Sequence, residues 1–132
     1  MKYLLSFVVD EAAMEAASPE EMREGLERWS AFDEEATQRG ALIACEPLES
    51  SSAATTVHVR DDGERIVSDG PFAESKEQLG GFCLLECENL DEALDWANKV
   101  PLRSGSIEIR PIMDLSEFGY QSRTLTPAKA TA

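Results

Sequence analysis

Apolar residues gather in short blocks along the chain, and the spacing inside each block predicts its secondary structure. Residues 2–9, KYLLSFVV, form a nearly continuous apolar run with β-branched and aromatic members, which is typical of a strand covered on both faces. Similar blocks occupy residues 41–48, 81–88 and 106–113. In the last block apolar and charged residues alternate up to Pro111, which predicts a strand end or a sheet edge. We therefore expect four main strands.

A long amphipathic helix is predicted between the first two strands. Ser18 offers an N-cap hydroxyl, Pro19 suits the first helical position, and Glu21 completes a capping box. The following apolar side chains recur at spacings of three and four residues, which places them on one face of a helix that ends at Gly40. This apolar stripe comprises Met22, Leu26, Trp29, Phe32 and Ala36.

A second helix and a hairpin complete the predicted elements. The helix follows a second capping sequence at residues 89–92 and stops before Pro101. The hairpin pairs residues 55–60 with residues 64–69 across an Asp-Gly turn, because Asp-Gly tolerates the positive φ angles that the turn requires. The Ser- and Ala-rich tract before it, residues 49–54, is expected to be a loop.

The order strand, helix, strand, hairpin, strand, helix, strand predicts an α+β, ferredoxin-like fold with an inserted β-hairpin. Both helices should then cover one face of an antiparallel sheet. The strands at residues 4–9 and 82–87 nevertheless carry apolar side chains on both faces, and exposure of so much apolar surface is unfavourable. We therefore expect a second subunit to cover the open face and the chain to form a homodimer.

Length and composition narrow the class of protein. A chain of 132 residues with 42% hydrophobic and 29% charged residues matches one globular domain. It contains no apolar run of membrane-spanning length, and acidic residues stand where a signal-peptide cleavage site would lie. A formal net charge of -14 with scattered Lys and Arg argues against direct binding of nucleic acid. We expect a cytoplasmic protein with no membrane partner.

Cysteine and histidine give little indication of metal or redox chemistry. Cys45, Cys83 and Cys87 are odd in number, lie in apolar sequence and form no CxxC pair, so we interpret them as small buried residues of a protein in a reducing compartment. His58 lies between two valines and is expected on a solvated or partly buried strand face. No second ligand accompanies it, and no phosphate-binding loop or nucleophile elbow occurs. We therefore expect neither a metal nor a cofactor.

Residues 68–82, SDGPFAESKEQLGGF, are the part of the sequence most suggestive of a site. Asp69 follows a strand and precedes Gly70, Pro71 and Phe72, a rigid and partly apolar frame. If this frame desolvates Asp69, burial disfavours the charged form and makes the carboxylate a useful general base. Alternatively, Asp69 accepts backbone N–H bonds in an Asx-type turn, Pro71 stiffens the loop and Phe72 fills the core.

The charged part of this stretch also has two interpretations. Glu74, Lys76 and Glu77 form a solvated charged segment, or Lys76 supplies a cation for an anionic substrate or for Asp69. The glycine pair at residues 80–81 is expected to allow a tight or closely packed entry into the next strand. Under the functional interpretation Asp69 is catalytic, and the substrate is bound by Gly70, Pro71, Phe72, Glu74 and Lys76.

An ordered set of motifs resembles a known family. The chain resembles YCII-related proteins of the DGPF type, because it carries a similar signature: Asp69-Gly70-Pro71-Phe72 followed by Glu74, Lys76, Glu77 and the pair Gly80-Gly81. The likeness extends through MKYLL, SPEEM, LDEALDWA and SIEIRPIM and covers residues 1–113. It implies a bacterial protein and a dimeric α+β barrel, in which two ferredoxin-like subunits press their open sheet faces together. Residues 114–132 then form a C-terminal extension, and its last ten or so residues are expected to be disordered.

The resemblance implies an enzyme only by fold analogy, because the family is largely uncharacterised. Barrel relatives such as muconolactone isomerase suggest a small-molecule enzyme that transfers protons in a cleft between sheet and helices. Asp69 would then be the base, Lys76 an electrostatic stabiliser and Phe72 a wall. Smaller YCII-type relatives carry a His near the start of the first helix, proposed to pair with an Asp, and the helix predicted here contains no His.

The resemblance also implies a second class of function. DGPF-type members resemble proteins found alongside, or fused to, extracytoplasmic-function sigma factors. The alternative is therefore a regulatory binding module without catalysis, in which the acidic surface approaches a basic protein partner. The residues that could anchor such a partner are Trp29, Trp96 and Phe118, although Trp29 also fits the core.

Overall fold

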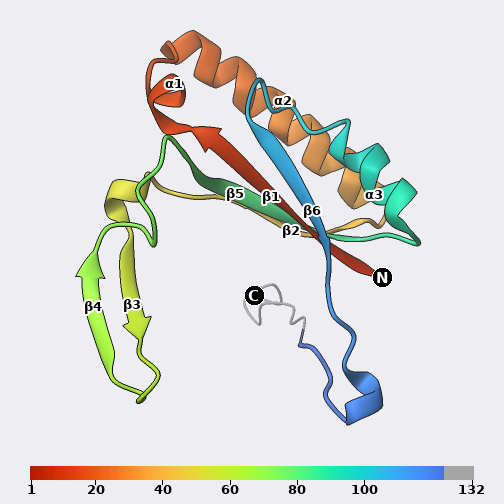
Figure 1. Cartoon of the computed structure of the whole chain (residues 1–132). Coiled ribbons are helices and arrows are strands. Elements are labelled where there is room, and N and C mark those ends of the chain that lie inside the picture. Colours follow the sequence, from red (N-terminus) through yellow and green to blue (C-terminus); the bar gives the residue numbers. More distant parts are fainter. Residues whose placement is uncertain (124–132) are drawn as a thin grey trace, which may run out of the picture.

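The computed structural model describes residues 1–123 and follows the predicted order of elements (Figure 1). The elements are β1 (Lys2–Asp10), α1 (Glu11–Glu15), α2 (Pro19–Gln38), β2 (Leu42–Pro47), the 3-10 turn η1 (Ser51–Ala53), β3 (Thr55–Val59), β4 (Arg65–Asp69), β5 (Glu77–Glu86), α3 (Leu90–Ala97), β6 (Ser106–Pro111) and the 3-10 turn η2 (Ser116–Phe118). The short helix α1 was not predicted; the Asp10 carboxylate caps it by accepting hydrogen bonds from two backbone N–H groups.

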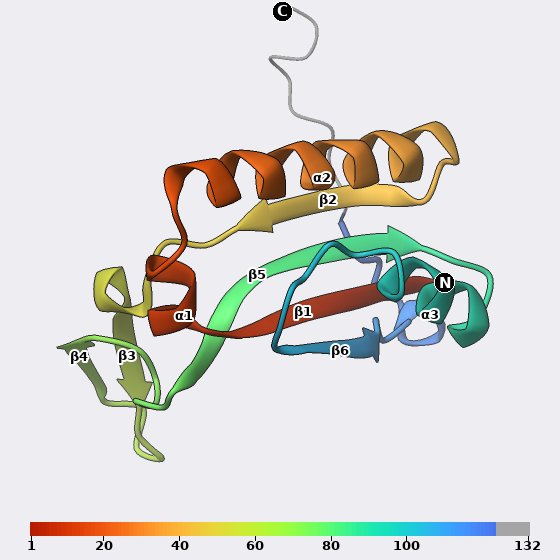
Figure 2. The ribbon, with the colours of Figure 1, turned by 90° about the horizontal axis from the view of Figure 1, so that it is seen from above.

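The main sheet has four strands in the order β2-β5-β1-β6, and every neighbouring pair is antiparallel. Helices α2 and α3 lie together on one face of it (Figure 2). This is the ferredoxin-like α+β fold, so the prediction of fold class is confirmed. The strand containing Pro111 is an edge strand, as its missing N–H donor indicated.

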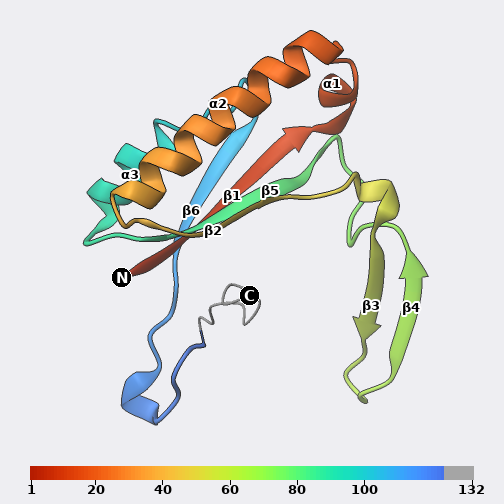
Figure 3. The same ribbon diagram turned by 180° about the vertical axis from the view of Figure 1, so that it is seen from behind.

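Strands β3 and β4 form a separate two-stranded sheet, which confirms the inserted hairpin. It leaves the main sheet at the end nearest α1 and extends away from the two helices (Figure 1, Figure 3). His58 is exposed on it, and its Nε2 lies 2.9 Å from the Ser68 hydroxyl across the hairpin. The solvated position expected for His58 is therefore confirmed.

The core lies between the main sheet and the helices. Alternate residues of β1 point into it, and Leu5 has no exposed surface. An aromatic row links the layers: the ring centroids of Phe7 and Trp29 are 5.3 Å apart, those of Trp29 and Phe32 5.9 Å, and those of Phe32 and Trp96 5.9 Å. Because Trp96 is buried in this row, it is not available to anchor a partner in this chain, which corrects that expectation.

The opposite face of the main sheet carries apolar side chains that none of the helices in residues 1–123 covers. Leu4 pairs with Leu84, and Ser6 with Phe82, and all four are partly exposed. Leu79, which pairs with Val8, is 49% exposed. The two-sided apolar character expected of β1 and β5 is therefore present, while its covering by a second subunit stays a prediction.

The cysteines depart from the sequence prediction. Cys45 and Cys83 lie opposite each other in the register of β2 and β5, and they form a disulfide with a Cα–Cα distance of 4.0 Å. The prediction of three unpaired cysteines was wrong, because spacing along the chain does not reveal which strands become neighbours. Cys87 is free and buried, and burial followed by the charge of Glu92 raises the pKa of its thiol to about 11. The argument from unpaired cysteines to a reducing compartment no longer holds.

The part of the C-terminal extension that the structure describes does not pack against the helical layer. Phe118 is 76% exposed and Tyr120 is 59% exposed. The residues expected to be disordered fall mainly at 124–132, which lie outside the described residues. None of the helices in the described chain is both long and apolar enough to cross a membrane.

Candidate active site

The DGPF loop, which comprises residues 69–72, lies at the base of the β3–β4 hairpin. Asp69 ends β4 opposite Thr55 and is exposed to solvent. Gly70 adopts a φ of 99°, which glycine tolerates best, and its N–H donates to the Ala54 carbonyl at 2.8 Å. The Thr56 hydroxyl donates to the Gly70 carbonyl at 2.7 Å. The loop backbone is therefore fixed by the hairpin that precedes it.

The side chains of this loop do not form the enclosed frame that the sequence suggested. Phe72 is 86% exposed, so it does not fill the core, which corrects that expectation, while its role as the wall of a site stays a prediction. The Asp69 carboxylate accepts no hydrogen bond from the described residues, and its exposure leaves it hydrated. The desolvation that would favour Asp69 as a base is thus missing from the described chain.

The charged residues of the stretch are directed to other partners. The Lys76 ammonium lies 3.6 Å from Oδ2 of Asp10, the residue that caps α1. The Lys76 side chain is 83% exposed, so this ion pair contributes little to stability. Glu74 is exposed. The predicted site residues Asp69, Phe72, Glu74 and Lys76 therefore do not converge on one cavity in this chain.

A cavity of about 260 Å³ lies between α2 and the sheet, on the β2 side of the molecule. Its lining comes from both helices of the N-terminal half, from three strands of the main sheet and from the segment after α3. The lining residues are Phe7, Val9, Met14, Leu26, Trp29, Ser30, Asp33, Cys45, Glu46, Pro47, Gly80, Gly81 and Leu102. Except for one serine and two acids, these residues are apolar or glycine.

Two glycines, Gly80 and Gly81, lie in the floor of the cavity. A Cβ atom on Gly80 would lie 2.7 Å from Cγ2 of Val9, and one on Gly81 would lie 3.0 Å from the Glu46 carbonyl oxygen. The close packing expected of this glycine pair is therefore confirmed. Above the floor, Leu26 of the predicted apolar stripe is 62% exposed, because the helix there overlies the cavity instead of packed strand residues.

Asp33 is the residue with the most unusual surroundings in the cavity. Its Oδ1 atom is buried and has no hydrogen-bond partner among the described residues. Burial, with a smaller contribution from the negative charge of Glu46, raises the pKa of the Asp33 carboxyl. A carboxyl group that holds its proton to higher pH than usual is a better candidate for proton transfer, because it is a stronger base once ionised.

Asp33 was not among the residues predicted from the sequence. It follows the core residue Phe32, where a charged residue ordinarily marks the solvated face of a helix. However, Asp33 lies seven residues after Leu26 and four after Trp29, so it continues their apolar row. An acid that interrupts an apolar row of a helix is the sequence feature from which Asp33 could have been predicted as a site residue.

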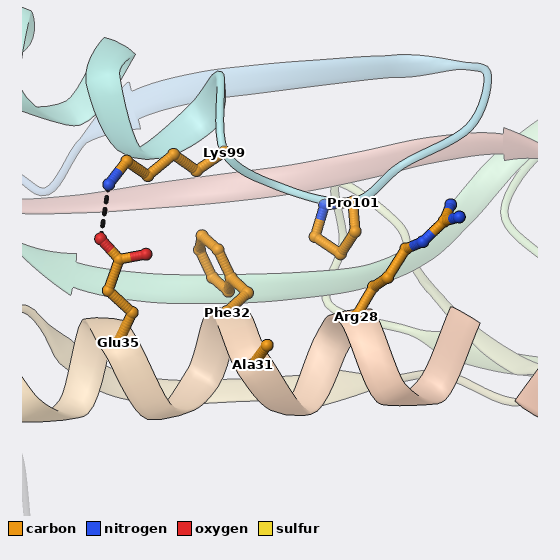
Figure 4. A pocket seen from close by; sticks show the side chains of 6 residues that line it. All are labelled: Arg28, Ala31, Phe32, Glu35, Lys99 and Pro101. Carbon is orange, nitrogen blue, oxygen red and sulfur yellow. Dashed lines mark hydrogen bonds and ion pairs between the residues drawn. The ribbon is translucent and has the colours of Figure 1, made fainter. Parts of the chain in front are cut away.

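A second, shallower hollow lies at the other side of α2 and is formed by Arg28, Ala31, Phe32, Glu35, Lys99 and Pro101 (Figure 4). Two of its charges are paired with each other, because the Lys99 ammonium binds the Glu35 carboxylate, and Arg39, outside the lining, lies 3.4 Å from the same carboxylate. The hydrogen bond from Lys99 lowers the pKa of Glu35. Among the described residues that line this hollow, no buried polar side-chain atom lacks a partner, so the cavity around Asp33 is the better candidate site.

The described residues contain no group of three or more His, Cys, Asp or Glu side chains placed to hold a metal ion. The chemistry available in the cavity comes from the Asp33 and Glu46 carboxyl groups, the Ser30 hydroxyl and the Trp29 ring. These groups can exchange protons, accept hydrogen bonds and contact an apolar ring. They provide no unpaired nucleophilic thiol, because Cys45 is in the disulfide.

Comparison with known proteins agrees with this architecture. An uncharacterized protein of Rhizobium meliloti (strain 1021), R00369, is 40% identical to the chain over 115 residues, which is 85% of this chain and 92% of that protein. The model of the YCII-related domain matches residues 1–116. The match spans the whole main sheet, both long helices and the inserted hairpin. The chain therefore belongs to the YCII-related family.

Proposed function

We propose that this YCII-related protein is a small-molecule enzyme that performs acid/base proton transfer in the cavity between α2 and the sheet. The observation that carries the proposal is a partly buried carboxyl group, Asp33, in an otherwise apolar cavity, with a raised pKa and an unpartnered oxygen. An unsatisfied buried acceptor costs on the order of 1 to 3 kcal/mol. A folded chain retains such a group at that cost most readily where the group has a chemical task.

The roles in the proposed site follow from position. Asp33 transfers the proton, because it combines partial burial with contact to the cavity. Glu46 supports it through its charge, which favours the protonated form of Asp33. Trp29 and Phe7 form an aromatic wall, with ring centroids 5.3 Å apart, and Gly80 and Gly81 line the floor without side chains.

The DGPF loop is the second proposed location of the chemistry. Here Asp69 is the base, Lys76 the cation and Phe72 the wall, with Gly70, Pro71 and Glu74 contacting the substrate. Since Asp69 and Phe72 are exposed in the single chain, this version requires cover from another molecule. It therefore depends on the proposed homodimer.

We propose the homodimer because of the uncovered apolar face of the main sheet. Partly exposed Leu4, Phe82 and Leu84 are large apolar side chains on the two central strands, and their removal from water on association is favourable. Sedimentation velocity at micromolar concentration tests this. A stable, well-folded monomer under those conditions contradicts it.

A regulatory binding module is the alternative function, with a sigma factor or another basic protein as partner. The hairpin favours it, because Val57, Val59 and Val67 are 51%, 60% and 65% exposed on a projecting two-stranded element. The net charge of -14 suits a basic partner. Under this alternative, substitutions in the hairpin abolish binding and substitutions in the cavity do not.

Solvent-deuterium exchange tests the proposed enzyme without knowledge of its substrate. Anionic, uncharged and cationic small carbonyl compounds are incubated with the protein in D2O, and deuterium incorporation at carbon is followed by NMR. For any compound that exchanges, we expect Asp33→Asn to lower the rate on the order of a hundredfold. The matched control is Glu27→Gln, which removes an acid from an exposed position of the same helix.

The outcomes separate the two locations. Loss of exchange in Asp33→Asn with full activity in Asp69→Asn assigns the chemistry to the cavity. The reverse pattern assigns it to the DGPF loop. Unchanged exchange in both variants, with the fold intact, or no exchange by the wild-type protein on any compound, contradicts the enzyme proposal and favours the binding module.

A further inference from the structure

The charges that line the cavity restrict what it can bind. Asp33 and Glu46 are acids, and none of the described lining residues is Lys, Arg or His. The whole chain carries a formal net charge of -14. An anionic ligand would meet two carboxyl groups with no cation to offset them, in surroundings where charges are poorly screened. The cavity therefore disfavours carboxylate and phosphate ligands.

The walls favour a small apolar body. Phe7, Val9, Leu26 and Leu102 contribute apolar side chains, and Trp29 contributes an aromatic ring. The volume of about 260 Å³ is small for a ligand site, since cavities for drug-sized ligands span roughly 300 to 1,000 Å³. A single ring with a short substituent fits this space better than a nucleotide or a long chain.

The polar groups of the cavity are mainly hydrogen-bond acceptors, with the Ser30 hydroxyl as a donor. Oδ1 of Asp33 on α2 is buried and unpartnered, and Glu46 on β2 adds a second acidic acceptor. An ammonium group carries three N–H donors and no acceptor. It also gains charge attraction from both acids and, where it lies over the Trp29 ring, a cation–π contact.

We propose that the cavity binds a small aromatic or alicyclic amine in its protonated form, with the ammonium group at Asp33 and Glu46 and the ring against Trp29. This inference rests on the proposed function, because it names the substrate class of the same site. It differs from the anionic substrate for which Lys76 was considered, since Lys76 does not line the cavity and lies beside Asp10.

The proposed binding mode is linked to protonation. The ionisable groups on the cavity wall are Asp33 on α2 and Glu46 on β2. An ammonium ligand favours the ionised form of Asp33, so its binding should release protons wherever free Asp33 is still partly protonated. Affinity should then rise with pH through the titration of Asp33. An anionic ligand would produce the opposite linkage.

Isothermal titration calorimetry with three matched probes tests the inference: benzylamine, benzyl alcohol and benzoate. Titrations in two buffers of different ionisation enthalpy measure the protons released. We expect benzylamine to bind about tenfold or more tighter than benzyl alcohol, because hydrogen bonds to charged groups exceed neutral ones by about 1.4 kcal/mol, which corresponds to tenfold. Benzoate should show no saturable binding.

Variants separate the contribution of each acid. Asp33→Asn should remove both the proton release and the preference for benzylamine over benzyl alcohol. Glu46→Gln, which changes a more exposed residue, should reduce that preference and keep the proton release. Glu27→Gln should behave as the wild-type protein. Tighter binding of benzoate or benzyl alcohol than of benzylamine, or benzylamine binding without proton release at any pH, overturns the inference.

The ligand class and the proposed catalytic role can be refuted separately. If an uncharged probe binds best while deuterium exchange still requires Asp33, only the ligand class is wrong. If benzylamine binds as expected while Asp33→Asn exchanges deuterium at the wild-type rate, the cavity is a binding site and the proposed catalytic role is wrong.

Discussion

The Cys45–Cys83 disulfide makes a quantitative prediction about stability. It joins two neighbouring strands of the main sheet across a sequence separation of 38 residues. Closing a loop of that length lowers the entropy of the unfolded chain by an amount worth about 4 kcal/mol at 25 °C in the chain-entropy model. A domain of this size has a total stability of only about 5 to 15 kcal/mol. Loss of the disulfide should therefore be visible in any unfolding experiment.

The perturbation is the double variant Cys45→Ala/Cys83→Ala, compared with Cys87→Ala. For 132 residues, 1 kcal/mol shifts the melting temperature by roughly 3 to 4 °C, so we expect the double variant to melt about 10 to 15 °C lower. A reductant should lower the melting temperature of the wild-type protein and leave that of the double variant unchanged. Cys87→Ala should retain the sensitivity to reductant, because Cys87 is outside the disulfide.

Thiol counting supplies the direct check. The wild-type protein, unfolded in denaturant without reductant, should expose one reactive thiol, that of Cys87. Three thiols under those conditions would show that the bond is absent in solution. A wild-type melting temperature that does not respond to confirmed reduction would refute the loop-entropy reasoning even if the bond is present.

Three further predictions follow from local structure, each measured by urea unfolding. Gly105→Ala should destabilise the fold by about 3 kcal/mol, because φ is 113° at this position and a Cβ there would lie 2.3 Å from a backbone oxygen. Gly25→Ala should instead stabilise helix α2 by about 0.5 to 1 kcal/mol, because a Cβ there would have no atom within 4 Å. Ser18→Ala should cost about 1 kcal/mol by removing the capping box, and Ser18→Asp should restore it. Burial and the charge of Glu46 raise the pKa of the Asp33 carboxyl in the folded chain above its unfolded value of 3.8. The protonated carboxyl therefore contributes fully to the stability of the fold below pH 3.8, and this contribution is lost as the pH rises through the folded pKa. Asp33→Asn should therefore gain stability relative to the wild-type protein as pH rises from 4 toward 7, and an equal difference at all pH values would contradict this.

The sequence predicted the architecture because the pattern of apolar residues reports burial directly. The nearly continuous apolar run of β1 marks it as a strand with two apolar faces, and the caps at Ser18 and Asn89 mark where two helices begin. Such signals are local, and each requires only the residues within one or two turns. The fold follows from their order, since few topologies accommodate it.

The candidate site was harder to predict because it depends on distances between elements. Asp33 and Glu46 come from a helix and a strand that meet only after the sheet has formed. The same holds for Cys45 and Cys83, whose pairing is fixed by the register of β2 and β5. The prediction that Phe72 fills the core was wrong because it used only local sequence. An aromatic residue in a motif predicts burial, but Phe72 follows the base of the hairpin and is exposed to solvent.

The two ends of the motif at residues 68–82 take part in different structures, and the short helix α1 connects these structures. Its glycine pair forms the floor of the cavity, whereas Gly70 is fixed to the hairpin. Between them Lys76 lies beside Asp10, which caps α1, and Met14 of α1 lines the cavity. Glu11 of the same short helix accepts a hydrogen bond of 2.6 Å from the backbone N–H of Ser51, at the entrance to the hairpin. The base of the hairpin therefore contacts the helix that forms part of the cavity wall, so a partner bound to the hairpin and a ligand bound in the cavity would both act on α1.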